Sequence, residues 1–277
     1  MTTIAVLGAG KIGEAMLAGL LRAGHPAAEL MFTERHPQRC AELTDRHGVR
    51  AVDPAEAARV ADVLVVAVKP QDIDLVLTQI AELRAGALVV SLCAGLPTSL
   101  YEDRLPTGTP VVRVMPNTPM VVGEAMSAIS GGRHADETHL VLVEELLRAV
   151  GRVVRVPEDQ QDAVTALSGS GPAYFFFLVE AMIDAGILLG LPRQVASELI
   201  VQSAVGAATM LRDCGEHPVA LREAVTSPAG TTIAAVRELE VHGVRAALLA
   251  AIEAARDRSV ELGRAHQVRL PPQAPSR

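Results

Sequence analysis

The first twenty residues place the strongest constraint on the fold of this 277-residue chain. An apolar run at 3–7 leads into Gly8-Ala9-Gly10-Lys11-Ile12-Gly13, and a helical pattern follows from residue 14. In such a strand–turn–helix unit the first glycine closes the turn and the second lets backbone approach a pyrophosphate. The third glycine lets the helix and strand pack closely. The motif predicts dinucleotide binding through Gly8, Gly10, Lys11, Ile12 and Gly13.

A second apolar run, Leu30 to Thr33, ends at Glu34 about twenty residues further on, as this fingerprint requires. An acid at that position commonly binds the ribose 2′-hydroxyl of NAD, whereas a nearby arginine binds the 2′-phosphate of NADP. Arg35 follows Glu34 directly, and the two could instead form a surface ion pair without a ligand. NADPH is the expected cofactor, with NADH as an open alternative.

Strand-like and helical segments alternate up to about residue 156. Alternation of this kind predicts an α/β, Rossmann-type, doubly wound and mostly parallel sheet with both faces covered. Beyond Pro119 the strands come too close together for a helical crossover each time, which predicts an antiparallel part at that edge. The expected strands span 3–7, 29–33, 62–68, 87–92, 110–115, 125–130 and 151–156.

The strand signal stops near Pro157, and six helical segments follow. We therefore predict a dinucleotide-binding domain at 1–157, an all-helical substrate and dimerisation domain at 158–267, and a disordered proline-rich tail at 268–277. Ligands of open parallel sheets bind beyond the carboxyl ends of the strands. Loops at these ends supply further candidate cofactor contacts: Ala67, Val68, Lys69, Pro70, Ala94 and Asn117. Lys11 and Lys69 are the only lysines in the chain.

Composition excludes several classes of function. The formal net charge is 25 − 32 = −7 without a basic block, so we expect no nucleic-acid partner. Three separated cysteines indicate a reducing, cytoplasmic compartment, and the histidines show no metal-binding spacing, so no metal is expected. The start has no signal-peptide pattern. Residues 172–191 are apolar enough to suggest a membrane span, but they contain Glu180 and Asp184. A helix buried in a subunit interface fits better.

The segment 226–232, Thr-Ser-Pro-Ala-Gly-Thr-Thr, precedes an amphipathic helix. Thr231 and Thr232 should therefore lie on a first helical turn, where unpaired amides favour a small anion such as a carboxylate. An ordinary N-cap is the alternative interpretation. The turn Ser168-Gly169-Ser170-Gly171-Pro172 is likewise open between a structural cap, with Pro172 early in a long helix, and direct substrate contact.

In this order the motifs resemble the pyrroline-5-carboxylate reductase family over nearly the whole chain. The stretches 162–174 and 226–240 carry most of the specificity. The resemblance implies NAD(P)H-dependent reduction of L-1-pyrroline-5-carboxylate to L-proline, the last step of proline biosynthesis, by hydride transfer to a cyclic imine. It also implies a homodimer, often assembled further into a decamer; the charges at Glu180 and Asp184 separately predict no membrane partner.

The resemblance also assigns roles to residues. Thr232 takes the position of the catalytic threonine that meets the ring nitrogen. The substrate-binding positions are Glu158, Ser227, Gly230, Thr231 and Thr232, and Arg35 takes the position used for the 2′-phosphate. Ala229 departs from the family by replacing the first glycine of Pro-Gly-Gly-Thr-Thr, which we expect to reshape the carboxylate loop.

Two rival functions share parts of this pattern. A β-hydroxyacid dehydrogenase has the same two-domain plan, but it needs a lysine in the helical domain, and this chain has none after Lys69. A non-catalytic NADP-sensing protein would keep the glycine turn. It would have no reason to keep the segment 226–232.

Overall fold

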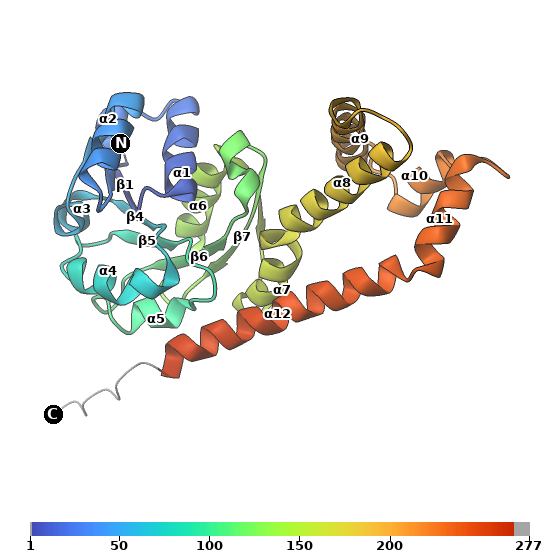
Figure 1. The fold of residues 1–277 in the computed structure, drawn as a ribbon. Coiled ribbons are helices and arrows are strands. Elements are labelled where there is room, and N and C mark those ends of the chain that lie inside the picture. The colour runs from blue at the N-terminus through green and yellow to red at the C-terminus, as the bar shows by residue number, and fades with distance from the viewer. Residues whose placement is uncertain (1, 269–277) are drawn as a thin grey trace. The chain divides into compact units, whose positions relative to one another are not determined.

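The computed structural model describes residues 2–268 and contains an eight-stranded sheet followed by helices (Figure 1). The strands lie in the order β3-β2-β1-β4-β5-β6-β7-β8, and every neighbouring pair is parallel except β6 with β7. The strands are β1 (Ile4–Leu7), β2 (Leu30–Thr33), β3 (Arg50–Ala51), β4 (Val63–Val66), β5 (Leu88–Ser91), β6 (Val111–Met115), β7 (Ala125–Gly131) and β8 (Gly151–Arg155). The chain reverses its direction of winding between β1 and β4, where open α/β sheets bind their ligands.

The helices of the first half connect these strands, and those of the second half follow one another directly. The α-helices are α1 (Lys11–Arg22), α2 (Pro37–His47), α3 (Pro54–Val60), α4 (Ile73–Gln79), α5 (Thr98–Glu102), α6 (Glu137–Arg148), α7 (Gln161–Val164), α8 (Gly171–Leu188), α9 (Arg193–Asp213), α10 (Pro218–Ala224), α11 (Thr231–Val241) and α12 (Val244–Val268). Short 3-10 turns lie at Ala27–Glu29, Pro70–Asp72, Thr118–Val122 and Glu158–Gln160, and a π-helical turn lies at Thr165–Gly169.

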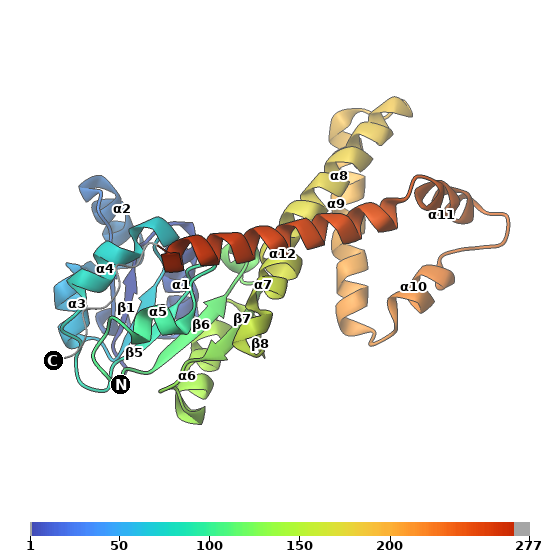
Figure 2. The same ribbon diagram turned by 90° about the horizontal axis from the view of Figure 1, so that it is seen from below.

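Helices cover both faces of the sheet, as Figures 1 and 2 show. Successive residues of a strand point to opposite faces, so Ile4 and Val6 of β1 join a core with α1, α2 and α6, whereas Ala5 and Leu7 join a core with α3, α4 and α5. Every residue of β1 and β4 is fully or almost fully buried. This two-sided burial explains the continuous apolar runs in the sequence.

The predicted fold class is confirmed, including the antiparallel edge at β6 and β7. Each predicted strand exists within one or two residues of its predicted bounds. The sequence analysis missed β3, because its two residues, Arg50 and Ala51, are exposed and form no apolar run.

The described chain divides into two compact units. The first unit ends at Ser170 and also includes the part of α12 that begins at Ala255. The second unit spans Gly171–Ala254. The first unit extends past residue 157 because Gln161 of α7 donates to Ser130 of β7. Within it the end of α12 is held by a hydrogen bond from Ser259 to Asp162 and by close backbone packing of Gly263 on Gly95. The predicted functional boundary between residues 157 and 158 stays a prediction. Residues 269–277 of the predicted tail lie outside the described residues, whereas residue 268 is the last residue of α12.

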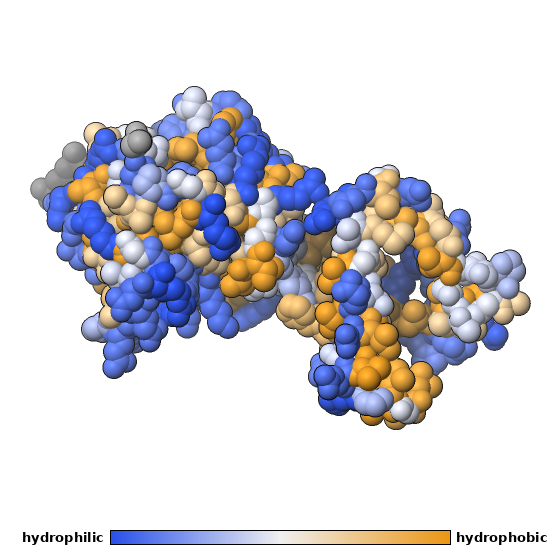
Figure 3. Space-filling view, turned by 90° about the horizontal axis from the view of Figure 1, so that it is seen from above, coloured by the Kyte–Doolittle hydropathy of each residue, from blue (hydrophilic) through white to orange (hydrophobic). Residues whose placement is uncertain are grey.

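The second unit leaves many large apolar side chains exposed. Phe175, Phe176 and Phe177 of α8 are each about two-thirds exposed, and Leu188 and Leu189 more so. Figure 3 shows apolar surface spread over these helices. Among the described residues one helical stretch, Glu158–Leu188, is long and apolar enough to cross a membrane by length and composition, which is weak evidence for a span. Exposed apolar area of this extent normally marks a surface that a partner covers.

A cluster of charges joins α1 to α2. Glu14, which is mostly buried, accepts hydrogen bonds from Arg39 and from Arg46 at 2.6 Å, and its carboxylate lies 3.3 Å from His47 Nε2. Burial alone would raise the pKa of Glu14. The hydrogen bonds from His47, Arg46 and Arg39 outweigh burial and lower it below its ordinary value of 4.5.

We expect Glu14→Gln to lower the free energy of unfolding at neutral pH by about 1–3 kcal/mol, since charged hydrogen bonds are lost. A lowered folded-state pKa stabilises the protein above the ordinary pKa, and this contribution disappears as the pH falls through the folded-state value. The difference between wild type and Glu14→Gln should therefore persist above the ordinary pKa of 4.5 and shrink as the pH falls below it in urea titrations. A difference that stays constant below this pH would contradict the assignment. Glu42→Gln, which removes a single exposed partner of Arg39, is the matched control.

Candidate active site

The glycine turn brings β1 and α1 together more closely than any side chain would permit. Gly8 has a positive φ of 94°, and a Cβ on it would lie 2.7 Å from Val68 Cγ1. A Cβ on Gly13 would lie 2.2 Å from the carbonyl oxygen of Gly8. At Gly10 the same construction meets nothing within 4 Å. Gly8 and Gly13 thus serve the packing of the protein, whereas Gly10 keeps its space open beside the N-terminus of α1.

The N-terminus of α1 is suited to an anion. Its N-cap is Gly10, and no side chain caps it. The amides of the first turn thus lack a side-chain acceptor, and the helix dipole favours negative charge there. Lys11 lies at this turn and is exposed. These features fit a pyrophosphate.

A cavity of about 540 Å³ lies beyond the carboxyl ends of β1, β2 and β4. This volume is in the range of small-molecule and cofactor sites. Seven of the predicted cofactor residues line it: Gly8, Gly10, Glu34, Arg35, Ala67, Val68 and Lys69. The structure does not bring Lys11, Ile12, Gly13, Pro70, Ala94 or Asn117 into its lining.

Several lining residues were not predicted from the sequence. They are Thr33, His36, Val52, Asp53, Pro54, Asp72, Leu75, Val76 and Gln79. Asp53 and Pro54 follow the missed strand β3, and Asp53 caps α3 by accepting from Glu56 N at 2.7 Å. The sequence analysis lacked the pairing of β3 with β2. This pairing places the Asp53–Pro54 turn beside Glu34 at the same sheet edge.

Three charged groups of the cavity are already engaged within the protein, and a fourth, Lys69, is not engaged by the described residues. Glu34 accepts from the amides of Arg35 and His36, and the guanidinium of Arg35 forms a two-point ion pair with Asp72. Lys69 is exposed and forms no ion pair within residues 2–268. It is therefore available to a ligand.

Three buried polar side chains lie beneath the loop after β4 and support it. Ser91 and Tyr101 share a hydrogen bond of 2.6 Å, and the Cys93 thiol donates to the carbonyl oxygen of Val68 at 3.3 Å. Burial raises the pKa of the Cys93 thiol and raises that of Tyr101 well above its ordinary value. Both groups are therefore protonated at neutral pH, and Cys93 holds Val68 in position as a hydrogen-bond donor.

Asn117 and Glu158 have structural partners. Asn117 accepts from Met126 N at 2.9 Å and donates to the carbonyl oxygen of Ser168 at 3.3 Å, joining the end of β6 to the π-helical turn. Glu158 accepts from Thr98 N and from Thr98 Oγ1, both at 2.7 Å. These contacts explain both residues without a ligand, and their predicted cofactor and substrate roles stay predictions.

The segment 226–232 forms a tight turn that opens α11. Gly230 N donates to the carbonyl oxygen of Ser227, and Pro228 precedes Ala229, whose φ is 55°. A proline followed by a residue of positive φ is the pattern of a type II turn, which ordinarily places glycine third. Gly230 is the N-cap of α11 and no side chain caps it, so Thr231 and Thr232 lie on the first turn as predicted. Neither threonine is the N-cap, which removes the ordinary-cap interpretation for them.

The turn at Ser168–Pro172 leads directly into α8. This helix begins at Gly171 with Pro172 as its second residue. Ser170 ends the preceding π-helical turn with helical backbone angles (φ −85°, ψ −16°), and the role of the turn as a cap or a substrate contact stays a prediction. Among the described residues no group of three His, Cys, Asp or Glu side chains is arranged to hold a metal ion.

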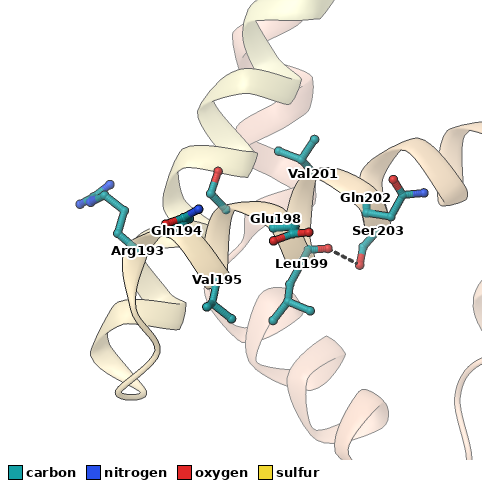
Figure 4. A pocket seen from close by; sticks show the side chains of 9 residues that line it. Arg193, Gln194, Val195, Glu198, Leu199, Val201, Gln202 and Ser203 are labelled. Atoms are coloured by element: carbon teal, nitrogen blue, oxygen red, sulfur yellow. Dashed lines mark hydrogen bonds between the residues drawn. The ribbon is translucent and has the colours of Figure 1, made fainter.

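A second hollow, of about 1180 Å³, lies beside α9 alone (Figure 4). Its lining runs from Arg193 to Ser203, and Ser203 Oγ donates to the carbonyl oxygen of Leu199. Val195, Leu199 and Val201 in this stretch are about half exposed. The hollow contains none of the predicted site residues.

The sheet order, the glycine turn and the cavity define a Rossmann-type NAD(P)-binding oxidoreductase. Residues 3–95 match a family described as "NADP oxidoreductase coenzyme F420-dependent". Residues 158–262 match the family described as "Pyrroline-5-carboxylate reductase dimerisation". The latter range includes the hollow beside α9 and most of the exposed apolar side chains.

Full-length relatives complete the assignment. A pyrroline-5-carboxylate reductase of Corynebacterium melassecola is 48% identical, over 95% of this chain and 100% of the relative. One of Mycobacterium tuberculosis is 45% identical, over 95% and 97%. The solved structure of a Coxiella burnetii pyrroline-5-carboxylate reductase is 36% identical with a TM-score of 0.88, over 94% and 98%. One of Plasmodium falciparum, with NADP bound, is 28% identical with a TM-score of 0.85. The chain belongs to the pyrroline-5-carboxylate reductase family.

The open space at Gly10 yields a test of the coenzyme site. Gly10→Ala should change the free energy of unfolding by less than about 1 kcal/mol, since its Cβ meets no protein atom. It should nevertheless weaken NADPH binding by about tenfold or more, because the methyl group occupies the approach to the α1 amides. Gly13→Ala is the contrasting variant and should lose about 2 kcal/mol or more of stability. Calorimetry and urea titration check both, and unimpaired NADPH binding by Gly10→Ala would refute the placement.

The backbone of Ala229 yields a second test. Left-handed conformations cost residues other than glycine about 1–2 kcal/mol, part of which is offset by the freedom of glycine in the unfolded chain. We expect Ala229→Gly to raise the free energy of unfolding by about 0.5–1 kcal/mol. Ala235→Gly, within the regular part of α11, should lower it by about 1 kcal/mol. Equal losses in the two variants would show that Ala229 is unstrained.

Proposed function

We propose that this chain reduces L-1-pyrroline-5-carboxylate to L-proline with NADPH, as the last step of proline biosynthesis. The observation that carries the proposal is the uncapped N-terminus of α11, with Thr231 and Thr232 on its first turn after a Ser227–Gly230 turn. The substrate has one carboxylate, which suits the unpaired amides of this first turn, and one ring nitrogen, which suits a threonine hydroxyl. Relatives named pyrroline-5-carboxylate reductase match the chain over nearly its full length.

The segment binds the substrate through backbone and side chains together. Amides of the first turn, at Thr231 and Thr232, receive the carboxylate, where the helix dipole adds to its binding, and Gly230 supplies the N-cap that leads into this turn. The hydroxyl of Thr232 orients the ring nitrogen. Ser227 lies at the start of the same turn, and Glu158 remains a separate candidate for substrate binding.

The reaction needs little acid catalysis from the protein. When bound, NADPH supplies the hydride that adds to the imine carbon, and the nitrogen carries the proton that completes the amine. A cyclic iminium is already electrophilic near neutral pH, so placement in a site without water accounts for most of the catalysis. Cys93 and the glycine turn fix the coenzyme side through Val68 and the α1 amides.

The oligomer, the compartment and the domain division belong to the same proposal. The family match at residues 158–262 supports a homodimer built on the exposed apolar helices of the second unit. We propose that dimers assemble further into a decamer in the cytoplasm, without membrane or nucleic-acid partners. The stretch Glu158–Leu188 is then covered by subunit contacts, and the functional domains divide near residue 157.

The deciding experiment follows the loss of NADPH absorbance, and separately of NADH absorbance, after pyrroline-5-carboxylate is added to purified protein. Rapid oxidation with proline formed supports the proposal. Coenzyme binding without turnover would favour the NADP-sensing alternative. Oxidation of a β-hydroxyacid would favour the dehydrogenase alternative, although the second unit contains no lysine.

Thr232→Ala should lower kcat/KM for pyrroline-5-carboxylate by about 10- to 100-fold, because the nitrogen loses its orienting hydroxyl. Thr232→Ser keeps the hydroxyl and should retain most of the activity. Near-normal turnover by Thr232→Ala would remove this residue from the mechanism. Coenzyme affinity, measured in parallel, should be the same in both variants, since Thr232 is not part of the coenzyme cavity.

A further inference from the structure

The corner of the cavity beyond β2 contains one cationic side chain and two anionic ones. Glu34, Arg35 and Asp72 all line the cavity, although Asp72 comes from the turn after β4, 37 residues from Arg35. Arg35 Nη1 lies 3.3 Å from Asp72 Oδ1, and Arg35 Nη2 lies 3.0 Å from Asp72 Oδ2. This is a two-point pair, in which both carboxylate oxygens occupy guanidinium donors.

The carboxylate of Asp72 serves Arg35 and not its own helix. Asp72 ends the 3-10 turn Pro70–Asp72 and leads into α4 with helical backbone angles, so its side chain makes no cap hydrogen bond to that helix. Its side chain is about one-quarter exposed, whereas that of Arg35 is 70% exposed. Arg35 is thus held over the cavity mouth mainly by this one ion pair.

The carboxylate of Glu34 likewise occupies hydrogen-bond donors at this corner, in this case backbone amides. Its Oε1 accepts from Arg35 N at 2.7 Å and from His36 N at 3.1 Å. Two successive amides of this kind would otherwise be donors for an anion. Both sets of donors at this corner, the guanidinium and the two amides, are therefore occupied by the protein's own carboxylates.

A 2′-phosphate that binds Arg35 must replace Asp72 or share the guanidinium with it. Sharing places a phosphate dianion beside a carboxylate, which is repulsive. NADH lacks the 2′-phosphate and avoids this cost, so Asp72 weakens the binding of NADPH more than the binding of NADH.

We propose that Asp72 is a specificity-determining residue, which lowers the preference for NADPH over NADH by competing with the 2′-phosphate for Arg35. The inference rests on the coenzyme role in the proposed function. If Asp72 instead held Arg35 in the orientation that binds the phosphate, it would raise the preference for NADPH over NADH. The pairing of both Asp72 oxygens with the guanidinium, and the 70% exposure that leaves the Arg35 side chain open to a ligand, favour competition.

The test measures dissociation constants for NADP⁺ and NAD⁺ by calorimetry, without pyrroline-5-carboxylate, at one low ionic strength. Asp72→Asn should bind NADP⁺ about three- to fivefold more tightly, as expected from losing one exposed ion pair, with NAD⁺ binding changed less than about twofold. In an Arg35→Gln background, the further change Asp72→Asn should alter NADP⁺ binding less than about twofold, because the group it competes for is absent.

Asp74→Asn is the matched control. It removes the same charge two residues away, Asp74 pairs with Arg104, and it does not line the cavity. It should leave the ratio of the two dissociation constants unchanged.

Weaker NADP⁺ binding by Asp72→Asn would overturn the proposal in favour of ordering. Equal changes for both coenzymes, the same shift in Asp74→Asn, or a shift that persists without Arg35 would also overturn it. A protein that shows the expected shift but does not oxidise NADPH with pyrroline-5-carboxylate would support this inference while refuting the proposed function.

Discussion

The close contact between the backbones of Gly8 and Gly13 determines how the coenzyme half of the molecule is arranged. A single methyl group on Gly13 would overlap the carbonyl oxygen of Gly8. This approach packs α1 against β1 and directs the N-terminus of α1 toward the carboxyl edge of the sheet. The remaining features of the cavity, including the loop held by Cys93 and the corner at Arg35, surround that fixed point.

The repeating parts of the fold could be predicted because each rests on a local pattern. Continuous apolar runs identify β1, β4 and β5, since strands buried on both faces need apolar residues at every position. The short spacing between β6 and β7 indicated their antiparallel pairing. Strand β3 had no such pattern, and the Asp53–Pro54 turn that follows it was missed for the same reason.

The site was predictable where a residue type has a local purpose and not where its role depends on a distant partner. Gly10 and Thr231 occupy positions that their own motifs define. The pairing of Arg35 with Asp72 depends on β2 and β4 both flanking β1, which no spacing in the sequence specifies. Glu158 and Asn117 also have partners within the fold, so their contacts in the structure leave the roles that motif matching assigned to them as predictions.

The return of α12 to the first unit bears on how the chain acquires its structure. Ser259 and Gly263, which contact Asp162 and Gly95, are among the last described residues to leave the ribosome. The nascent chain can form the sheet early, because domains form as units during synthesis. It cannot complete the sheet's helical covering until the entire second unit has been translated. The segment beside the Ala94–Gly95 loop is therefore the last to be secured, so early release of the chain would leave a sheet-forming product with an unfinished coenzyme half.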